Sequence, residues 1–221
     1  MILAIEKTSL FSLLVTQLNN FLVDEDEKNE LKKNFDEALF RLDKCFKNSS
    51  NKYYSRVIDG KKEGYFNPFH SVQYMIFLYI LANTIYLKGS KTFICDKLYY
   101  LNKMLNSVDI YYQVNLPEHF GAEHPVGTVI GRAQIGDYFY FYQNVTLGGV
   151  IKDGKEIYPR LGYHVEMCSN SSILGDCNIG NNVIIGSGAI IKNQDVPDNS
   201  IVFGQSPNLI IKPNKNKIIN F

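Results

Sequence analysis

Apolar residues recur at every sixth position through the second half of the chain. One series runs through Val129, Ile135, Phe141 and Leu147, and a second through Leu161, Met167, Ile173, Ile179, Ile185 and Ile191. A six-residue period fits neither an α-helix nor a flat strand. It is typical of a parallel β-helix in which three steps close one coil of about 18 residues. The recurring side chains are therefore expected to point into the β-helix.

The two series are out of step with each other. Leu147 and Leu161 lie 14 positions apart, which is one six-residue step plus eight. A polar loop of about eight residues, near 150–159, is therefore predicted to interrupt the coils. Long loops inserted into regular repeats often carry function.

Residues 1–106 follow a helical period instead. Phe35, Leu39, Leu42 and Phe46 recur at spacings of three and four, as on one face of an amphipathic helix. The acidic stretch 24–30 precedes them, where a helix dipole favours negative charge. Two more helices are expected at about 71–87 and 90–105, with a polar connection over 48–68. The fold class is thus α+β, with an α-helical domain over 1–108 and a β-helix domain over 109–221.

Composition narrows the possible functions. The 221 residues carry 23 basic and 22 acidic side chains, a net charge of +1, so a nucleic-acid partner is not expected. The four cysteines form no C-x-x-C pair, which gives no support for a metal site or a disulfide framework. The apolar run 73–87 is too short to span a membrane, and the first 20 residues do not resemble a signal peptide. A cytoplasmic location is expected.

Several short motifs occur at characteristic spacings. They are 69-FHSVQ-73, 109-DI-110, Glu123-His124 with His124 15 residues after Asp109, and 145-VTLGG-149 followed by a polar loop and Tyr158-Pro159. Together they resemble the motifs of the serine acetyltransferase family of hexapeptide-repeat acyltransferases. The resemblance covers about residues 65–210. It implies a left-handed β-helix and assembly into a homotrimer or a dimer of trimers. It also implies acetyl-CoA as co-substrate, bound in grooves between neighbouring subunits.

The resemblance further implies that His124 is the catalytic base and that Asp109 orients it. The chemistry agrees, because acetyl transfer to an alcohol needs a base, and histidine accepts a proton at neutral pH. A carboxylate on the other ring nitrogen stabilises the imidazolium that forms. Backbone N–H groups of 147-LGG-149 are candidate donors to the oxyanion. His70 is interpreted as a helix-packing residue, and His119 and His164 as surface or loop residues.

The acceptor loop departs from the family pattern. Glu123 replaces the usual Asp, and Ile157-Tyr158-Pro159 stands where the family has an Arg-His-Pro that holds the carboxylate of serine. Losing that guanidinium would leave a carboxylate unpaired. Glu123, Ile157 and Tyr158 are therefore candidate substrate-binding residues for a different acceptor. The aromatic surroundings favour a sugar, such as a unit of a capsule or O-antigen polysaccharide.

The last coils match the family better, at residues expected to contact acetyl-CoA. These candidates are Gly148, Gly149, Gly186, Ser187, Gly188, Ala189, Gly204 and Lys192. The tail 215-KNKIINF-221 lacks the family's acidic, Ile-ended terminus, so a partnership with cysteine synthase is not expected.

Three functions remain open. The first is an O-acetyltransferase acting on a sugar hydroxyl, and the second is a serine O-acetyltransferase of cysteine biosynthesis. The third is a non-catalytic trimeric scaffold, which the Asp109–His124 spacing disfavours because a scaffold needs no base.

Overall fold

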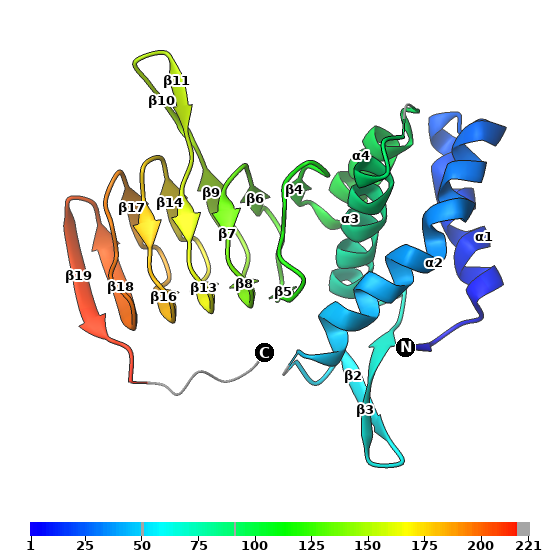
Figure 1. The fold of residues 1–221 in the computed structure, drawn as a ribbon, viewed down its shortest axis with the longest axis horizontal. Helices are drawn as coiled ribbons and strands as arrows, with labels where there is room; N and C mark the ends of the chain where they lie inside the picture. The colour runs from blue at the N-terminus through cyan, green and yellow to red at the C-terminus, as the bar shows by residue number, and fades with distance from the viewer. Residues whose placement is uncertain (50, 91, 216–221) are drawn as a thin grey trace. The chain divides into compact units, whose positions relative to one another are not determined.

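The chain divides into two compact units. In this computed structural model, which describes residues 1–49, 51–90 and 92–215, one unit comprises Met1–Asn106 and Tyr111–Gln113, and the other comprises Ser107–Ile110 and the residues from Val114 onward. The first unit is mainly helical, and the second is a left-handed β-helix (Figure 1).

Over the residues that the structure describes, four α-helices and a small sheet build the helical unit. The helices are α1 (Lys7–Leu18), α2 (Glu25–Lys47), α3 (Ser71–Leu87) and α4 (Ile94–Asn106), with a 3₁₀ turn η1 (Asn19–Phe21). The predicted amphipathic helix is α2, whose Phe35, Leu42 and Phe46 are buried. It starts at a capping box in which Asp24 accepts from the Glu27 N–H and Glu27 accepts from the Asp24 N–H.

The connection over 48–68 is more ordered than expected. It contains β2 (Ser55–Ile58) and β3 (Lys61–Phe66), an antiparallel hairpin to which β1 (Ile2–Leu3) adds in parallel. Asp59 and Gly60, with φ of 49° and 74°, form its turn. An Asp-Gly pair is a strong hairpin signal, so this part of the sequence prediction was wrong for a recognisable reason.

The β-helix has three parallel faces. The first contains β7 (Gln134–Ile135), β12 (Arg160–Leu161) and β15 (Asn178–Ile179). The second contains β5 (Phe120–Ala122), β8 (Phe139–Phe141), β13 (Val165–Met167), β16 (Val183–Ile185) and β18 (Ser200–Gln205). The third contains β4 (Asp109–Ile110), β6 (Val129–Ile130), β9 (Thr146–Gly148), β14 (Ser172–Leu174) and β17 (Ile190–Lys192).

Stacked apolar side chains fill this unit. Leu147 pairs with Ile173, and Ile173 pairs with Ile191 one coil further on. Each is fully buried, which stabilises the fold by about 1.5–3 kcal/mol per side chain. The prediction fails at Val129, which is 41% exposed, because the neighbouring Ile130 pairs with Leu147 and occupies the core.

The predicted insertion is present as a hairpin. β10 (Val150–Lys152) pairs antiparallel with β11 (Lys155–Ile157), and the hairpin projects from the coils in Figure 1. Leu161 lies 26 positions after its partner Ile135, whereas Ile179 lies 18 positions after Leu161. The last strand, β19 (Asn208–Pro213), runs antiparallel to β18.

Candidate active site

His124 lies at the corner that joins the second face to the third, between β5 and β6. Its φ is 51°, and its side chain is 80% exposed. The Nε2 atom lies 4.0 Å from Oε1 of Glu123. An exposed imidazole at a turn is accessible to a substrate from outside the coils.

Asp109 lies in the coil that neighbours this corner. Its N–H donates to the carbonyl of Thr128 at 2.8 Å, and β4 pairs with β6 through Asp109 and Val129. A second backbone hydrogen bond joins the same two segments, because the Gly127 N–H donates to the carbonyl of Ser107 at 2.9 Å. The 15-residue spacing therefore brings Asp109 against the segment that follows His124.

A polar cluster that the sequence analysis missed extends from Glu123 along the second face. Tyr142 stacks one coil above Glu123, because the Glu123 N–H donates to Phe141 and the Tyr142 N–H donates to Met167, both at 3.1 Å. The Tyr142 hydroxyl hydrogen-bonds the carboxylate of Glu166. Side chains at alternate strand positions face the same way, so the polar residues amid the apolar ones in 139–142 and 165–167 could have revealed this cluster.

Burial changes the acidity of the cluster. Desolvation raises the pKa of Glu166, and the charge of Glu123 raises it further, against the opposing effect of the Tyr142 hydrogen bond. Desolvation also raises the pKa of Tyr142. The pKa of the Cys168 thiol rises to about 11 through burial and the charge of Glu166, so this thiol is not activated as a nucleophile.

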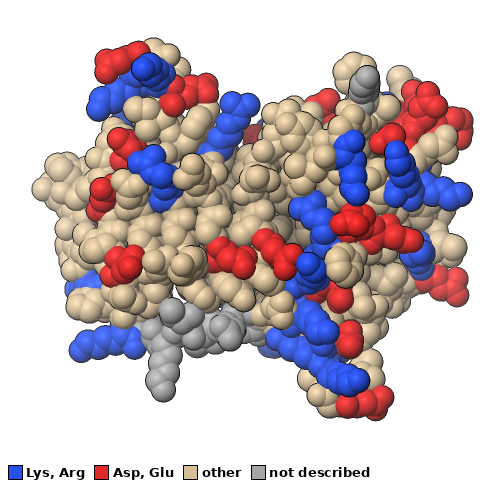
Figure 2. Space-filling model, in the orientation of Figure 1, with Lys and Arg blue, Asp and Glu red and all other residues tan. Residues whose placement is uncertain are grey.

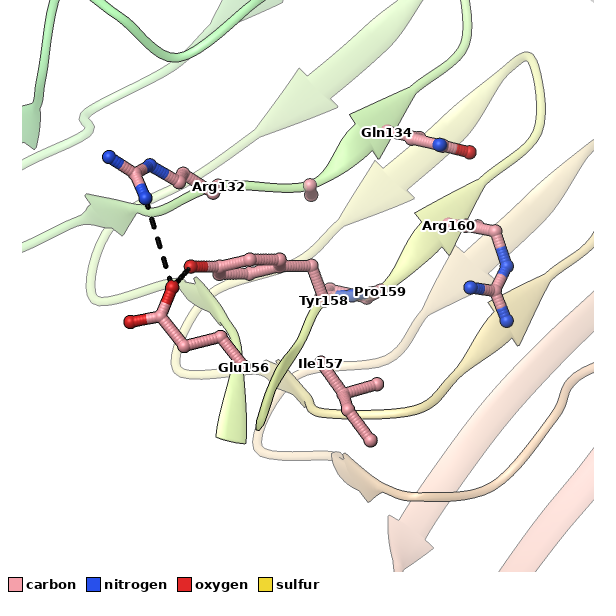
Figure 3. Close-up of a pocket in the computed structure, with 8 residues that line it drawn as sticks. Arg132, Gln134, Glu156, Ile157, Tyr158, Pro159 and Arg160 are labelled. Carbon is pink, nitrogen blue, oxygen red and sulfur yellow. Dashed lines mark hydrogen bonds and ion pairs between the residues drawn. The ribbon is translucent and has the colours of Figure 1, made fainter. Parts of the chain in front are cut away.

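Ile157 and Tyr158 line a pocket of about 360 Å³ at a different corner, between the third and first faces. Its other lining residues are Arg132, Ala133, Gln134, Glu156, Pro159 and Arg160 (Figure 3). Gly149 makes room for this arrangement, because a Cβ there would lie 2.6 Å from the Tyr158 ring. Within one chain, Glu123 and His124 therefore lie at one edge of the third face, and Ile157 and Tyr158 lie at its other edge.

The candidate coenzyme residues occupy several positions on the β-helix. Gly188 has a φ of 74° and open space around its Cα, and the Ser187 hydroxyl lies 3.2 Å from that of Ser169. Lys192 is exposed on β17. Ala189, by contrast, is fully buried, and its N–H and C=O bond within the coils. Its side chain belongs to the core.

The other candidate glycines differ in what surrounds them. A Cβ at Gly148 would meet only the Leu174 side chain, at 3.8 Å. A Cβ at Gly186 would lie 2.7 Å from the Phe203 ring. Gly204 has a φ of 82° and lies near the end of β18, next to the turn that leads into β19.

The other three histidines make structural contacts, and His119 and His164 lie in turns between strands, as expected. His70 caps α3, accepting from the Gln73 N–H at 3.4 Å. His119 bonds Asp137, with 2.7 Å between Nδ1 and Oδ2, and its ring stacks on Tyr138. Tyr138 stacks in turn on His164, with 4.6 Å between ring centroids. These rings form a column at the corner between the first and second faces.

Metal binding, membrane spanning, thiols and surface charge can also be assessed over the described residues. Within the part of the chain that the structure describes, no three His, Cys, Asp or Glu side chains gather as a metal site, and no helix is long and apolar enough to cross a membrane. All four cysteines are free thiols. Acidic and basic side chains are interspersed on the face in Figure 2. Residues 216–221, most of the tail used to judge cysteine synthase binding, lie outside the described residues.

Known proteins share this fold and parts of this sequence. No family model matches the chain. A serine acetyltransferase of Synechococcus elongatus is 37% identical over 106 residues, covering 48% of this chain and 43% of the relative. One from Staphylococcus xylosus is 28% identical over 144 residues, covering 65% of each chain. Over these stretches the chain is similar in sequence to serine acetyltransferases.

Solved structures of serine acetyltransferases support the fold. That of Neisseria gonorrhoeae superposes with a TM-score of 0.70 at 22% identity, covering 94% of this chain and 80% of the other. The structure of a Neisseria gonorrhoeae serine acetyltransferase in complex with serine gives a TM-score of 0.66 at 24% identity, covering 92% and 83%. The matches to these two curated relatives span less than two thirds of the length of each relative.

Proposed function

We propose that this protein is an O-acetyltransferase that uses acetyl-CoA and acts on the hydroxyl of serine or a close amino-acid analogue. The observation that carries the proposal is the exposed imidazole of His124, 4.0 Å from the carboxylate of Glu123 and beside the coil that holds Asp109. An accessible base with a carboxylate beside it is the group that O-acetylation requires.

In this mechanism His124 removes the proton of the acceptor hydroxyl as its oxygen attacks the thioester carbonyl. The tetrahedral oxyanion is stabilised by backbone N–H groups, for which the 147–149 turn is the proposed source. When the C–S bond breaks, the imidazolium returns the proton to the departing CoA thiolate. The acetyl group passes directly between substrates, in keeping with the raised pKa of Cys168.

The comparisons favour serine over the saccharide acceptor expected from the aromatic residues. The similar curated proteins are named serine acetyltransferases, and one structure with this fold contains serine. The pocket chemistry agrees, because the Tyr158 hydroxyl bonds Glu156 and the pocket is lined by two arginines. A charged pocket suits an amino acid better than the apolar face of a sugar ring.

Assembly into trimers is part of the proposal. His124 and the Tyr158 pocket lie on opposite edges of the third face, and acetyl-CoA is proposed to bind between neighbouring copies, along the coils that carry Gly188. In this arrangement one copy contributes the base and its neighbour the pocket. Partnership with cysteine synthase stays open, since neither the described residues nor the comparisons support the expectation that it is absent.

A histidine substitution tests the catalytic proposal. With L-serine and acetyl-CoA, His124→Ala is expected to release free CoA thiol about 10²- to 10⁴-fold more slowly than the unchanged protein. His70→Asn is the control, because asparagine is also a good N-cap for α3. Equal rates for His124→Ala and the unchanged protein would refute a base at this position. A high rate with a nucleotide sugar but none with serine would refute the acceptor class alone.

A further inference from the structure

The Tyr158 pocket already contains a bound carboxylate, supplied by the chain itself. Nη1 of Arg132 lies 3.8 Å from Oε2 of Glu156, and the Tyr158 hydroxyl donates to the same oxygen. Figure 3 shows the two side chains converging on Glu156 from different sides of the pocket. A guanidinium and a hydroxyl directed at one oxygen are the donors that a substrate carboxylate would need.

These donors come from segments far apart in the sequence. Arg132 lies in the turn between β6 and β7, and Tyr158 directly follows the inserted hairpin. The coils bring them together because β12, which follows Tyr158, pairs with β7. A guanidinium is thus present in the pocket although Ile157 occupies the position where the family has its arginine.

Glu156 is held weakly enough to be displaced. The side chains of Arg132 and Glu156 are 62% and 61% exposed, and exposed ion pairs contribute little because water competes for both charges. The second arginine of the pocket has other partners. Arg160 donates to Asn178 at 2.7 Å and to Asp176 at 3.1 Å, both in the next coil. Arg132 instead contacts Glu156, whose exposed carboxylate a ligand could replace.

We propose that Arg132 and Tyr158 form the carboxylate-binding subsite for the acceptor, and that Glu156 occupies this subsite until the acceptor displaces it. The inference rests on the proposed function and names the residues that would recognise the carboxylate of its acceptor. Glu156 also favours anionic acceptors, because only an anion replaces the ion pair that Arg132 loses when Glu156 is displaced.

Paired acceptors separate this subsite from the rest of the mechanism. KM is measured for L-serine and for L-serinamide, which lacks the negative charge, in the unchanged protein and three variants. Arg132→Gln is expected to raise the KM for serine about 10- to 100-fold, with little change for serinamide. Tyr158→Phe is expected to raise it less, because one neutral donor is lost. Glu156→Gln is expected to lower the KM for serine, because the internal competitor is removed.

Lys155→Gln is the matched control. It removes one positive charge from the same hairpin, outside the pocket lining, and should leave the serine-to-serinamide preference unchanged. Equal KM changes for both acceptors in Arg132→Gln would overturn the subsite. An unchanged KM for serine in Glu156→Gln would overturn its occupation by Glu156. If the unchanged protein acetylates neither acceptor, the proposed function itself fails, which is a different outcome.

Discussion

Glu166 is an ionisable side chain on the outer side of a strand whose neighbouring residues, Val165 and Met167, are fully buried. Its carboxylate accepts from Tyr142 and lies close enough to Glu123 for their charges to repel. Desolvation and a like charge both disfavour the ionised form, so the folded protein retains a proton here at a higher pH than the unfolded chain does.

Replacing this carboxylate should stabilise the protein at neutral pH. The raised pKa of Glu166 means that its favourable contribution is complete below its ordinary value of 4.5 and is lost as the pH rises through the folded-state pKa. Glu166→Gln is uncharged and can still accept from Tyr142. It should therefore unfold at higher denaturant concentration than the unchanged protein at pH 7, and the two should converge below about pH 4.

The control for this measurement is Glu37→Gln, at an exposed position on α2. It should change the unfolding midpoint little at either pH. A Glu166→Gln variant that is less stable at pH 7 would mean that the carboxylate makes favourable contacts which outweigh its desolvation.

At the scale of elements, one corner of the β-helix repeats the same backbone conformation in four successive coils. Tyr138, His164, Asn182 and Asn199 occupy equivalent turns, with φ of 62°, 54°, 55° and 53°. Asparagine tolerates this left-handed region better than most residues. The first two coils instead place aromatic rings there, and these stack, while the last two join through an Asn182–Asn199 bond of 2.8 Å.

The His164 ring should make stability sensitive to acid. Burial lowers the pKa of His164, against a smaller opposing effect of Asp137. The neutral ring therefore stabilises the fold above pH 6.5, and this contribution is lost as the pH falls through the lowered pKa. His164→Asn keeps a residue suited to positive φ and removes the titrating group. Its unfolding free energy should fall less between pH 7.5 and 5.5 than that of the unchanged protein.

His124→Asn provides the comparison, because that ring is 80% exposed and its corner also has a positive φ. This variant controls for the change from histidine to asparagine at a corner with positive φ. If His164→Asn retains the pH dependence of the unchanged protein, the acid sensitivity belongs to another group.

What the sequence predicted well are the features that repeat. The six-residue period from Leu161 to Ile191 requires no knowledge of distant contacts, since each coil buries the same position. At Val129 the period failed because the inward positions Ile130 and Ile135 lie five residues apart instead of six. The Asp59-Gly60 hairpin was missed although its signal is local.

The site was only partly predictable. The roles of Asp109, Glu123 and His124 come from the resemblance and stay predictions, whereas Arg132 could not be placed in the Tyr158 pocket before the pairing of β7 with β12 was known. The eight-residue insertion moves the strand register, so the relation of Arg132 to Glu156 depends on the path of the hairpin. Glu166 and Tyr142 are also neighbours only because β8 and β13 pair.

At the scale of the whole molecule, apolar side chains lie exposed beside the proposed base. Val126 is 58% exposed and Val129 is 41% exposed, on the segment directly after His124. Apolar groups that gather at one edge of a functional site commonly mark an interface. If a second copy covers this edge, the third face with its two corners would lie at the junction between chains.

Disrupting this edge should therefore separate the chains and remove activity together. In sedimentation velocity the unchanged protein is expected at a multiple of the single-chain mass, whereas Val129→Asp should shift toward single chains because burying an unpaired charge is costly. Its rate of acetyl transfer should fall in parallel with the assembled fraction. Val57→Asp, at a 72% exposed valine on β2, should change neither quantity. A Val129→Asp protein that stays assembled, or an unchanged protein that sediments as single chains while fully active, would place the complete site within one chain and contradict the shared arrangement.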